Sequence, residues 1–241
     1  MYYRTGLITG TPVAIGGGDG CCTARGAGLV EPGNAYTYIG SSAWVSQILQ
    51  HPVLDPKARI FNFLDADGKS CHVCGTVQTG AAAFDWTLKN LLGSGDAGAD
   101  ISRIENMARQ VRPGAEGVLF LPTLMGSRTP YWDPNTRGVL MGFTLYHDQR
   151  HIARAIYEGI AFALNSCAQI IAEYGAPITS MMLAGGGARS DGAPRLAVLG
   201  VPLAATSISP SRADTTPAAV RAALNPGRSI PARIAMIAIV M

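Results

Sequence analysis

The chain has 241 residues, of which 48% are hydrophobic and 15% are charged. That is enough apolar mass for a packed core, in one or two domains, and too little charge for a disordered chain. The net charge of +3 comes from scattered residues without a basic run, which argues against a nucleic-acid partner. No apolar stretch approaches the roughly 18 residues of a membrane-spanning helix, so no membrane partner is expected. Five irregularly spaced cysteines indicate reduced thiols and a cytoplasmic location.

The first half of the chain alternates between short apolar runs and turn-rich segments. We expect a strand at 11–15, a helix at 21–28, one hairpin with strands at 35–39 and 43–45, a second hairpin with strands at 59–64 and 71–77, and helices at 80–92 and 99–111. The turn of the second hairpin is the segment Asp65-Ala66-Asp67-Gly68.

The second half contains the clearest helix. Isoleucines at 152, 156 and 160 begin a three- and four-residue spacing that continues to 171, so we expect a helix from Asp148 to Tyr174 with one buried face. Strands are expected at 117–121 and 178–184, with a proline- and glycine-rich loop at 122–135 after the first of them. Strands that alternate with helices favour an α/β domain.

Three glycine-rich turns are candidate ligand contacts. They are Gly16 to Asp19, Gly40-Ser41-Ser42, and Gly185 to Ala188. Glycine lets backbone N–H groups approach a ligand, and such groups bind phosphate oxygens. Three turns of this kind suggest a nucleotide cleft, although any one of them alone is more simply explained as a tight turn.

The common nucleotide and metal motifs do not fit. Gly68-Lys69-Ser70 resembles the end of a phosphate-binding loop, but the glycine required five residues earlier is Phe63. Neither strand-end glycine turn continues as the dinucleotide pattern, because the sixth residue is Cys21 in one and Ser190 in the other. Cys71 and Cys74 have metal-ligand spacing, but no second pair accompanies them.

Asp19 is the most suggestive single residue. It follows a predicted strand and is surrounded by glycine, so its carboxylate would face a cleft. That suits a general base that takes a proton from a hydroxyl during phosphoryl transfer. An aspartate at this place also commonly caps the helix that follows, and position alone does not decide between the two roles.

Six segments follow one another in the order found in a known enzyme family. They are 6–19 (GLITGTPVAIGGGD), 38–42 (YIGSS), 80–86 (GAAAFDW), 121–143 (LPTLMGSRTPYWDPNTRGVLMGF), 151–159 (HIARAIYEG) and 183–190 (LAGGGARS). Together they resemble the C-terminal domain of the FGGY carbohydrate kinases, and most closely the xylulose kinase branch. Residues 138–158 are similar to a family signature, with a departure at Phe143. The resemblance covers residue 6 to about residue 190.

The resemblance implies an α/β, ribonuclease-H-like lobe of the actin/hexokinase-like ATPases, with a mixed sheet and flanking helices. It implies ATP as phosphate donor with Mg²⁺ bridging its phosphates, and it assigns no metal ligand to this chain. Asp19 matches the catalytic base, which also binds the sugar substrate. The residues that match the ATP site are Gly40, Ser41 and Ser42 in a phosphate hairpin, Gly80 close to the phosphate path, and Gly186, Gly187 and Ala188 in the turn against adenosine.

The resemblance also predicts the domain organisation. Residues 1–190 match the C-terminal kinase lobe with the nucleotide side and the base, and 191–241 are a shortened or diverged remainder of the same lobe. The N-terminal lobe, which supplies most sugar contacts in the family, is missing and is an expected partner. Because phosphoryl transfer needs positioning from both sides, we expect the isolated chain to be inactive. An exposed inter-lobe face would favour a homodimer.

The expected function is ATP-dependent phosphorylation of a hydroxyl on a pentulose such as xylulose, or on a related small-molecule sugar or polyol. One alternative is a non-catalytic, actin-like module for nucleotide binding or assembly, which would have no need of a base at Asp19. Another is a different two-lobed kinase or ATPase on the same scaffold, against which the loop at 121–143 argues.

Overall fold

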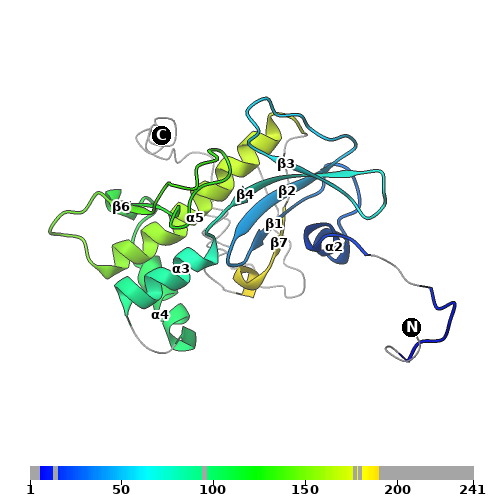
Figure 1. Cartoon of the computed structure of the whole chain (residues 1–241). Helices are drawn as coiled ribbons and strands as arrows, with labels where there is room; N and C mark the ends of the chain where they lie inside the picture. The colour runs from blue at the N-terminus through cyan, green and yellow to red at the C-terminus, as the bar shows by residue number, and fades with distance from the viewer. Residues whose placement is uncertain (1–5, 13–15, 94–96, 176–177, 179–180, 190–241) are drawn as a thin grey trace.

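A computed structural model describes residues 6–12, 16–93, 97–175, 178 and 181–189 (Figure 1). Its main sheet has five strands in the order β3-β4-β2-β1-β7. The strands are β1 (Ala35–Ile39), β2 (Ala43–Leu49), β3 (Phe61–Leu64), β4 (Cys71–Val77) and β7 (Met182–Ala184). Neighbouring strands are antiparallel except β7, which runs parallel to β1. The expected mixed sheet is therefore confirmed.

Both predicted hairpins form, because backbone hydrogen bonds close both turns and glycine takes the positive φ that one of them needs. In the β1–β2 hairpin Ile39 pairs with Ala43, and the intervening turn is closed by the Gly40 N–H, which donates to the Ser42 carbonyl at 2.9 Å. In the β3–β4 turn the Gly68 N–H donates to the Asp65 carbonyl, and Gly68 has the positive φ that glycine tolerates. Backbone N–H groups of the same turn hold the pKa of the Asp67 carboxyl at about 2.

Four α-helices are present among the described residues: α2 (Asp19–Gly26), α3 (Ala81–Thr87, continuing as a π-helical turn over Leu88–Leu92), α4 (Ala97–Arg109) and α5 (Gln149–Ala172). α5 begins at a capping box, in which the Asp148 carboxylate accepts from the Arg150 N–H and the His151 ring accepts from the Asp148 N–H. This arrangement satisfies N–H groups that a helix start leaves without partners.

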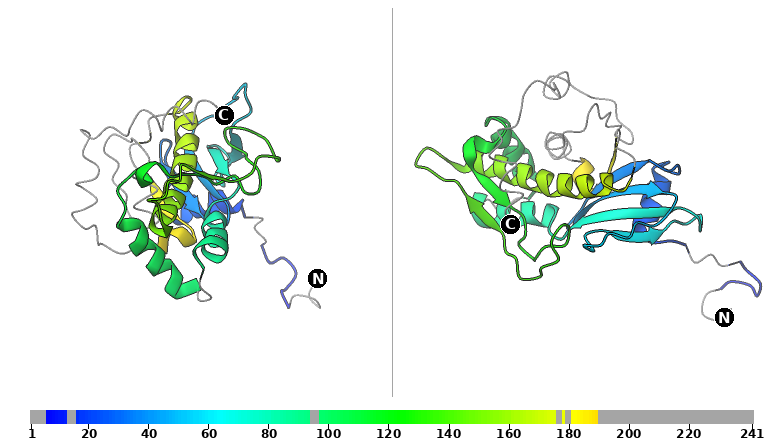
Figure 2. Two further views of the ribbon diagram at one scale, coloured as in Figure 1. Left: turned by 90° about the vertical axis from the view of Figure 1, so that its left-hand side faces the viewer. Right: turned by 90° about the horizontal axis from the view of Figure 1, so that it is seen from above.

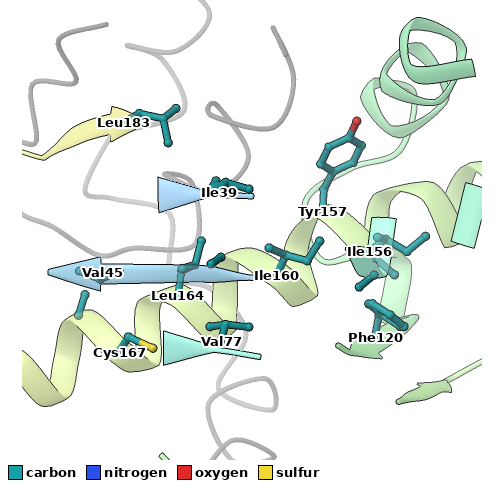
Figure 3. Close-up of a cluster of buried hydrophobic side chains, with 14 of the residues drawn as sticks. Ile39, Val45, Val77, Phe120, Ile156, Tyr157, Ile160, Leu164, Cys167 and Leu183 are labelled. Atoms are coloured by element: carbon teal, nitrogen blue, oxygen red, sulfur yellow. The ribbon is translucent and has the colours of Figure 1, made fainter. Parts of the chain in front are cut away.

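The core lies between α5 and one face of the sheet. Ile160, Leu164 and Cys167 of α5 lie close to Val45 and Val77 of the strands (Figure 3). α3 and α4 pack beside α5 (Figures 1 and 2). By length and hydropathy α5 could cross a membrane. However, 72% of its most apolar stretch is buried inside the protein, as in a core helix.

A small antiparallel sheet formed by β5 (Leu119–Leu121) and β6 (Val139–Met141) meets α5 at Gly159. A Cβ on Gly159 would overlap the Phe120 carbonyl.

We therefore expect Gly159→Ala to lower the free energy of unfolding by about 1–3 kcal/mol, because overpacking forces the backbone to shift. Urea denaturation measures this effect. Gly26→Ala in α2, where nothing lies within 4 Å, is the control and should be neutral or slightly stabilising.

Some element predictions were wrong or incomplete. Thr11 and Pro12 are not in a strand, and 13–15 lie outside the described residues. Instead the Thr11 N–H and hydroxyl both bond to the Ile8 carbonyl, which makes a local turn. The helix expected at 21–28 begins earlier, at Asp19, and ends at Gly26. β6 was not predicted, since its three residues are all apolar and give the sequence no alternation of polar and apolar positions.

Candidate nucleotide and catalytic site

The β1–β2 hairpin turn, Gly40-Ser41-Ser42, lies against the start of α3. The Gly80 N–H donates to the Ser41 carbonyl at 2.8 Å, and the Ala81 N–H donates to the Gly40 carbonyl at 2.7 Å. A Cβ on Gly80 would lie only 2.7 Å from the Cβ of Ala43 and 2.9 Å from the Ser42 carbonyl carbon. The structure therefore brings two of the sequence-predicted ATP segments into direct contact.

These contacts turn the carbonyl oxygens of the hairpin turn towards the protein. The carbonyl oxygens of Gly40, Ser41 and Ser42 all accept hydrogen bonds from the protein's own backbone. Ser41 is nevertheless exposed. Because the oxygens that would repel an anion are occupied on the protein side, the exposed edge of the turn is suited to phosphate.

The Gly185–Ala188 turn reaches the same end of the sheet through β7. β7 pairs with β1 in parallel, and its Ala184 lies opposite Tyr38. Gly185 has a φ of +88°, and a Cβ there would lie 2.6 Å from the Ile39 carbonyl oxygen. A Cβ on Gly187 would lie 2.7 Å from the Ile39 Cβ. Only glycine permits this close approach, so three predicted ATP segments meet at the end of β1.

Asp19 is the first residue of α2 and is exposed. The N-cap residue is Gly18, and no side chain caps the helix, so the alternative role of Asp19 as the helix cap is not supported. Its carboxylate accepts a hydrogen bond from the adjacent Gly20 N–H at 2.9 Å. None of the contacts that join the three glycine segments includes Asp19, and within the described residues no ion pair involves it.

Side chains of the sheet hold α2, and sequence reasoning missed all of them. The Tyr36 hydroxyl donates to the Gly20 carbonyl at 2.9 Å and accepts from the Trp44 indole N–H at 3.0 Å. Arg25 forms a two-point ion pair with Asp65, at 3.0 and 2.8 Å. Because Tyr36 alternates with the core residue Ala35 along β1, α2 lies on the sheet face opposite α5.

A buried cluster lies between α2 and the sheet. It consists of Cys21 of α2, Asp65 and His72. Their ligand-type atoms lie within 4.8 Å of one another. Both carboxylate oxygens of Asp65 already accept from Arg25, whose positive charge opposes a cation at this place. Burial and the nearby Asp65 charge raise the pKa of the Cys21 thiol. We therefore interpret the cluster as a polar network rather than a metal site.

His72 makes stability depend on pH. Burial lowers the pKa of its ring in the folded protein, although Asp65 acts in the opposite direction. The unfolded chain takes up this proton near pH 6.5, so it binds more protons than the folded state below that pH. We expect stability to be lost as the pH falls through 6.5, and His72→Gln to flatten this slope in urea denaturation between about pH 7.5 and 5.5. An unchanged slope would mean that another group titrates.

Comparison with known proteins gives a consistent result. Residues 35–213 match the profile of the FGGY family of carbohydrate kinases, C-terminal domain. The match begins at Ala35, so Asp19 precedes it. The gluconokinase of Bacillus subtilis is 32% identical over 79% of this chain and 38% of its own length. The xylulose kinase of Escherichia coli is 33% identical over 77% of this chain and 37% of its own length.

Solved structures agree. A gluconate kinase and a xylulose kinase from Lactobacillus acidophilus each have a TM-score of 0.73 and 27% identity, and each match covers 82% of this chain and 39% of theirs. The chain thus spans less than two fifths of the length of the curated relatives it matches. The expected actin/hexokinase-like fold is confirmed, and the chain belongs to the FGGY family of carbohydrate kinases through its C-terminal domain.

Proposed function

We propose that this chain is the nucleotide-side lobe of an ATP-dependent kinase that phosphorylates a hydroxyl of a pentulose such as xylulose. The observation that carries the proposal is the meeting of three glycine segments at the end of β1. Gly80 supports the hairpin turn through its bond to Ser41, and Gly185 and Gly187 approach Ile39 more closely than any side chain would allow. Such a concentration of side-chain-free backbone is suited to a nucleotide.

The residues present fit ATP in distinct ways. The exposed turn at Ser41 would bind phosphate oxygens, Gly80 would leave the phosphate path open, and the turn at Gly186, Gly187 and Ala188 would lie against adenosine. Mg²⁺, bound by the phosphates, supplies charge neutralisation during transfer. Among the described residues we assign no side chain as a ligand of this ion.

Asp19 is the proposed base and binds the sugar hydroxyl. Its carboxylate accepts the proton as the hydroxyl oxygen forms a bond to the γ-phosphorus and the bond to the β-phosphate oxygen breaks. Exposure without an ion pair among the described residues leaves this carboxylate available to a substrate. Residues 1–190 would form the functional lobe and 191–241 its remainder.

The proposal requires a second lobe. The relatives are more than twice as long as the matched segment, and phosphoryl transfer depends on groups placed on both sides of the substrate. We therefore propose that the isolated chain is inactive and that a preceding N-terminal lobe supplies the remaining contacts. Free cysteines among the described residues support a reducing, cytoplasmic location, and the uncovered inter-lobe face would favour a homodimer of the isolated chain.

The test compares this chain alone with a two-lobed protein. In the latter the chain is preceded by its own upstream reading frame or by the N-terminal part of the Escherichia coli xylulose kinase. ADP formation from ATP is measured with xylulose, ribulose, gluconate and glycerol. The expected result is turnover with a pentulose by the two-lobed protein only. Preference for gluconate would correct the substrate, and ATP-dependent sedimentation without turnover would favour the actin-like assembly module.

A further inference from the structure

Arg25 and Asp65 form a two-point contact between α2 and the β3–β4 turn. The Arg25 Nε and Nη2 atoms lie 3.0 and 2.8 Å from the two carboxylate oxygens of Asp65, and Nη2 lies 3.0 Å from Asp67. The Asp65 side chain is fully buried. A two-point bond between a guanidinium and a buried carboxylate fixes direction as well as distance.

Asp65 is itself held from the other side. Its Oδ1 atom accepts from the Ala66 N–H at 2.6 Å and lies 3.4 Å from the Nε2 atom of His72. The Nδ1 atom of His72 lies 3.4 Å from the Ser46 hydroxyl. His72 therefore lies between Ser46 of β2 and Asp65 of the β3–β4 turn, although its buried Nε2 atom makes no hydrogen bond.

The Arg25–Asp65 contact and the Tyr36 contact lie at opposite ends of α2. Arg25 is in the last turn of the helix, while the Tyr36 hydroxyl binds the carbonyl of Gly20, next to Asp19. Between them the Cys21 thiol lies 3.5 Å from the Leu64 carbonyl. Contacts at both ends of this helix of 8 residues oppose its sliding and rotation and so restrict the place of its first residue.

We propose that Arg25 and Asp65 are positioning residues that fix α2, and through it the Asp19 carboxylate, relative to the hairpin turn at Gly40. This inference rests on the proposed role of Asp19 as base. Misplacement of a reacting group by about 1 Å can cost about a hundredfold in rate. Arg25→Lys keeps the charge but loses the two-point geometry, so we expect kcat of the two-lobed protein to fall about tenfold or more while KM for ATP changes less than about twofold.

Arg59→Lys is the matched control. Arg59 makes a similar two-point contact with Asp55, at 3.0 and 2.9 Å, and also binds Glu173 just beyond α5. It therefore loses the same geometry at a place not linked to α2. Arg59→Lys is expected to lower thermal stability as Arg25→Lys does, but to leave kcat unchanged. Equal losses of kcat in the two variants would show a general effect on folding and would overturn the proposal.

A double-mutant cycle separates positioning from structure. If Arg25 acts through Asp19, Arg25→Lys lowers kcat in the parent protein but produces no further loss in the Asp19→Asn protein. Additive losses would contradict the proposal. If Asp19→Asn alone leaves kcat unchanged, the proposed role of Asp19 as base fails first, whereas a low Asp19→Asn kcat with a normal Arg25→Lys kcat overturns only the positioning role.

A second measurement needs no activity. Hydrogen–deuterium exchange of α2 amides in this chain should become faster in Arg25→Lys and stay unchanged in Arg59→Lys, because only the former loosens the helix. Asp65→Glu, which keeps the charge but moves the carboxylate, should resemble Arg25→Lys. Unchanged α2 exchange in both Arg25→Lys and Asp65→Glu would show that Tyr36 alone holds the helix.

Discussion

Asp19→Asn in the two-lobed kinase is expected to lower kcat for sugar phosphorylation about 10²–10⁴-fold, the range of a lost general base. Asparagine has nearly the same shape but cannot accept the proton from the sugar hydroxyl at neutral pH. Because Asp19 is not among the residues that meet at the hairpin turn, the Kd for ATP should change no more than a few-fold. Steady-state kinetics and ATP titration measure the two quantities separately.

Glu31→Gln provides the matched control for this prediction. Glu31 is an exposed carboxylate in the loop after α2, so the substitution removes the same charge near the same helix. Its kcat should equal that of the parent protein. If Asp19→Asn retains full turnover, Asp19 has no part in proton transfer and the proposed mechanism is wrong.

Gly80→Ala is expected to weaken ATP binding strongly. The added methyl group would lie 2.7–2.9 Å from Ala43 and Ser42, atoms of backbone and Cβ that cannot rotate away. In the variant the hairpin turn must move, and this movement would strain the hydrogen bond that the Gly80 N–H donates to the Ser41 carbonyl. Loss of one hydrogen bond to a charged phosphate costs about 1.5–3 kcal/mol, which raises Kd about ten- to a hundredfold.

Calorimetric titration with ATP tests this expectation. Gly26→Ala is the control, since it adds the same methyl group to an exposed helical position with nothing within 4 Å, and its Kd should be unchanged. A Gly80→Ala protein that folds normally and binds ATP as the parent does would show that the hairpin turn does not contact the phosphates.

Local chemistry explains what could be predicted from the sequence. The spacing of Ile152, Ile156 and Ile160 predicts a helix, and α5 forms there. The expectation of one buried face was wrong for its first half, because residues 153–161 are all buried between the sheet and the neighbouring helices. The Asp65–Gly68 turn predicts a hairpin because its residues form the turn through their own backbone and side-chain bonds. The glycine turns were recognisable for the same reason, since closely approached backbone needs glycine.

Contacts between distant segments could not be predicted. Arg25 and Asp65 are far apart in the chain, and neither is distinguished by spacing or flanking motif from the other charged residues. β6 forms through pairing with β5, although Val139 and Met141 are exposed apolar residues, so the sequence shows no alternation of polar and apolar positions there. The expected strand at 11–15 failed at Thr11, where a local turn satisfies the groups that a sheet partner would have bonded.

The bond between Tyr36 and Gly20 has a consequence for motion. Tyr36 is on β1, the same short strand that ends in the hairpin turn, and Trp44 of β2 braces its hydroxyl. The proposed base and the proposed phosphate hairpin are thus both attached to β1, so we expect them to move together. In a two-lobed kinase of the proposed kind, hinge closure over ATP would carry both together. The distance between the proposed proton acceptor and the phosphate would then stay constant in the open and closed states.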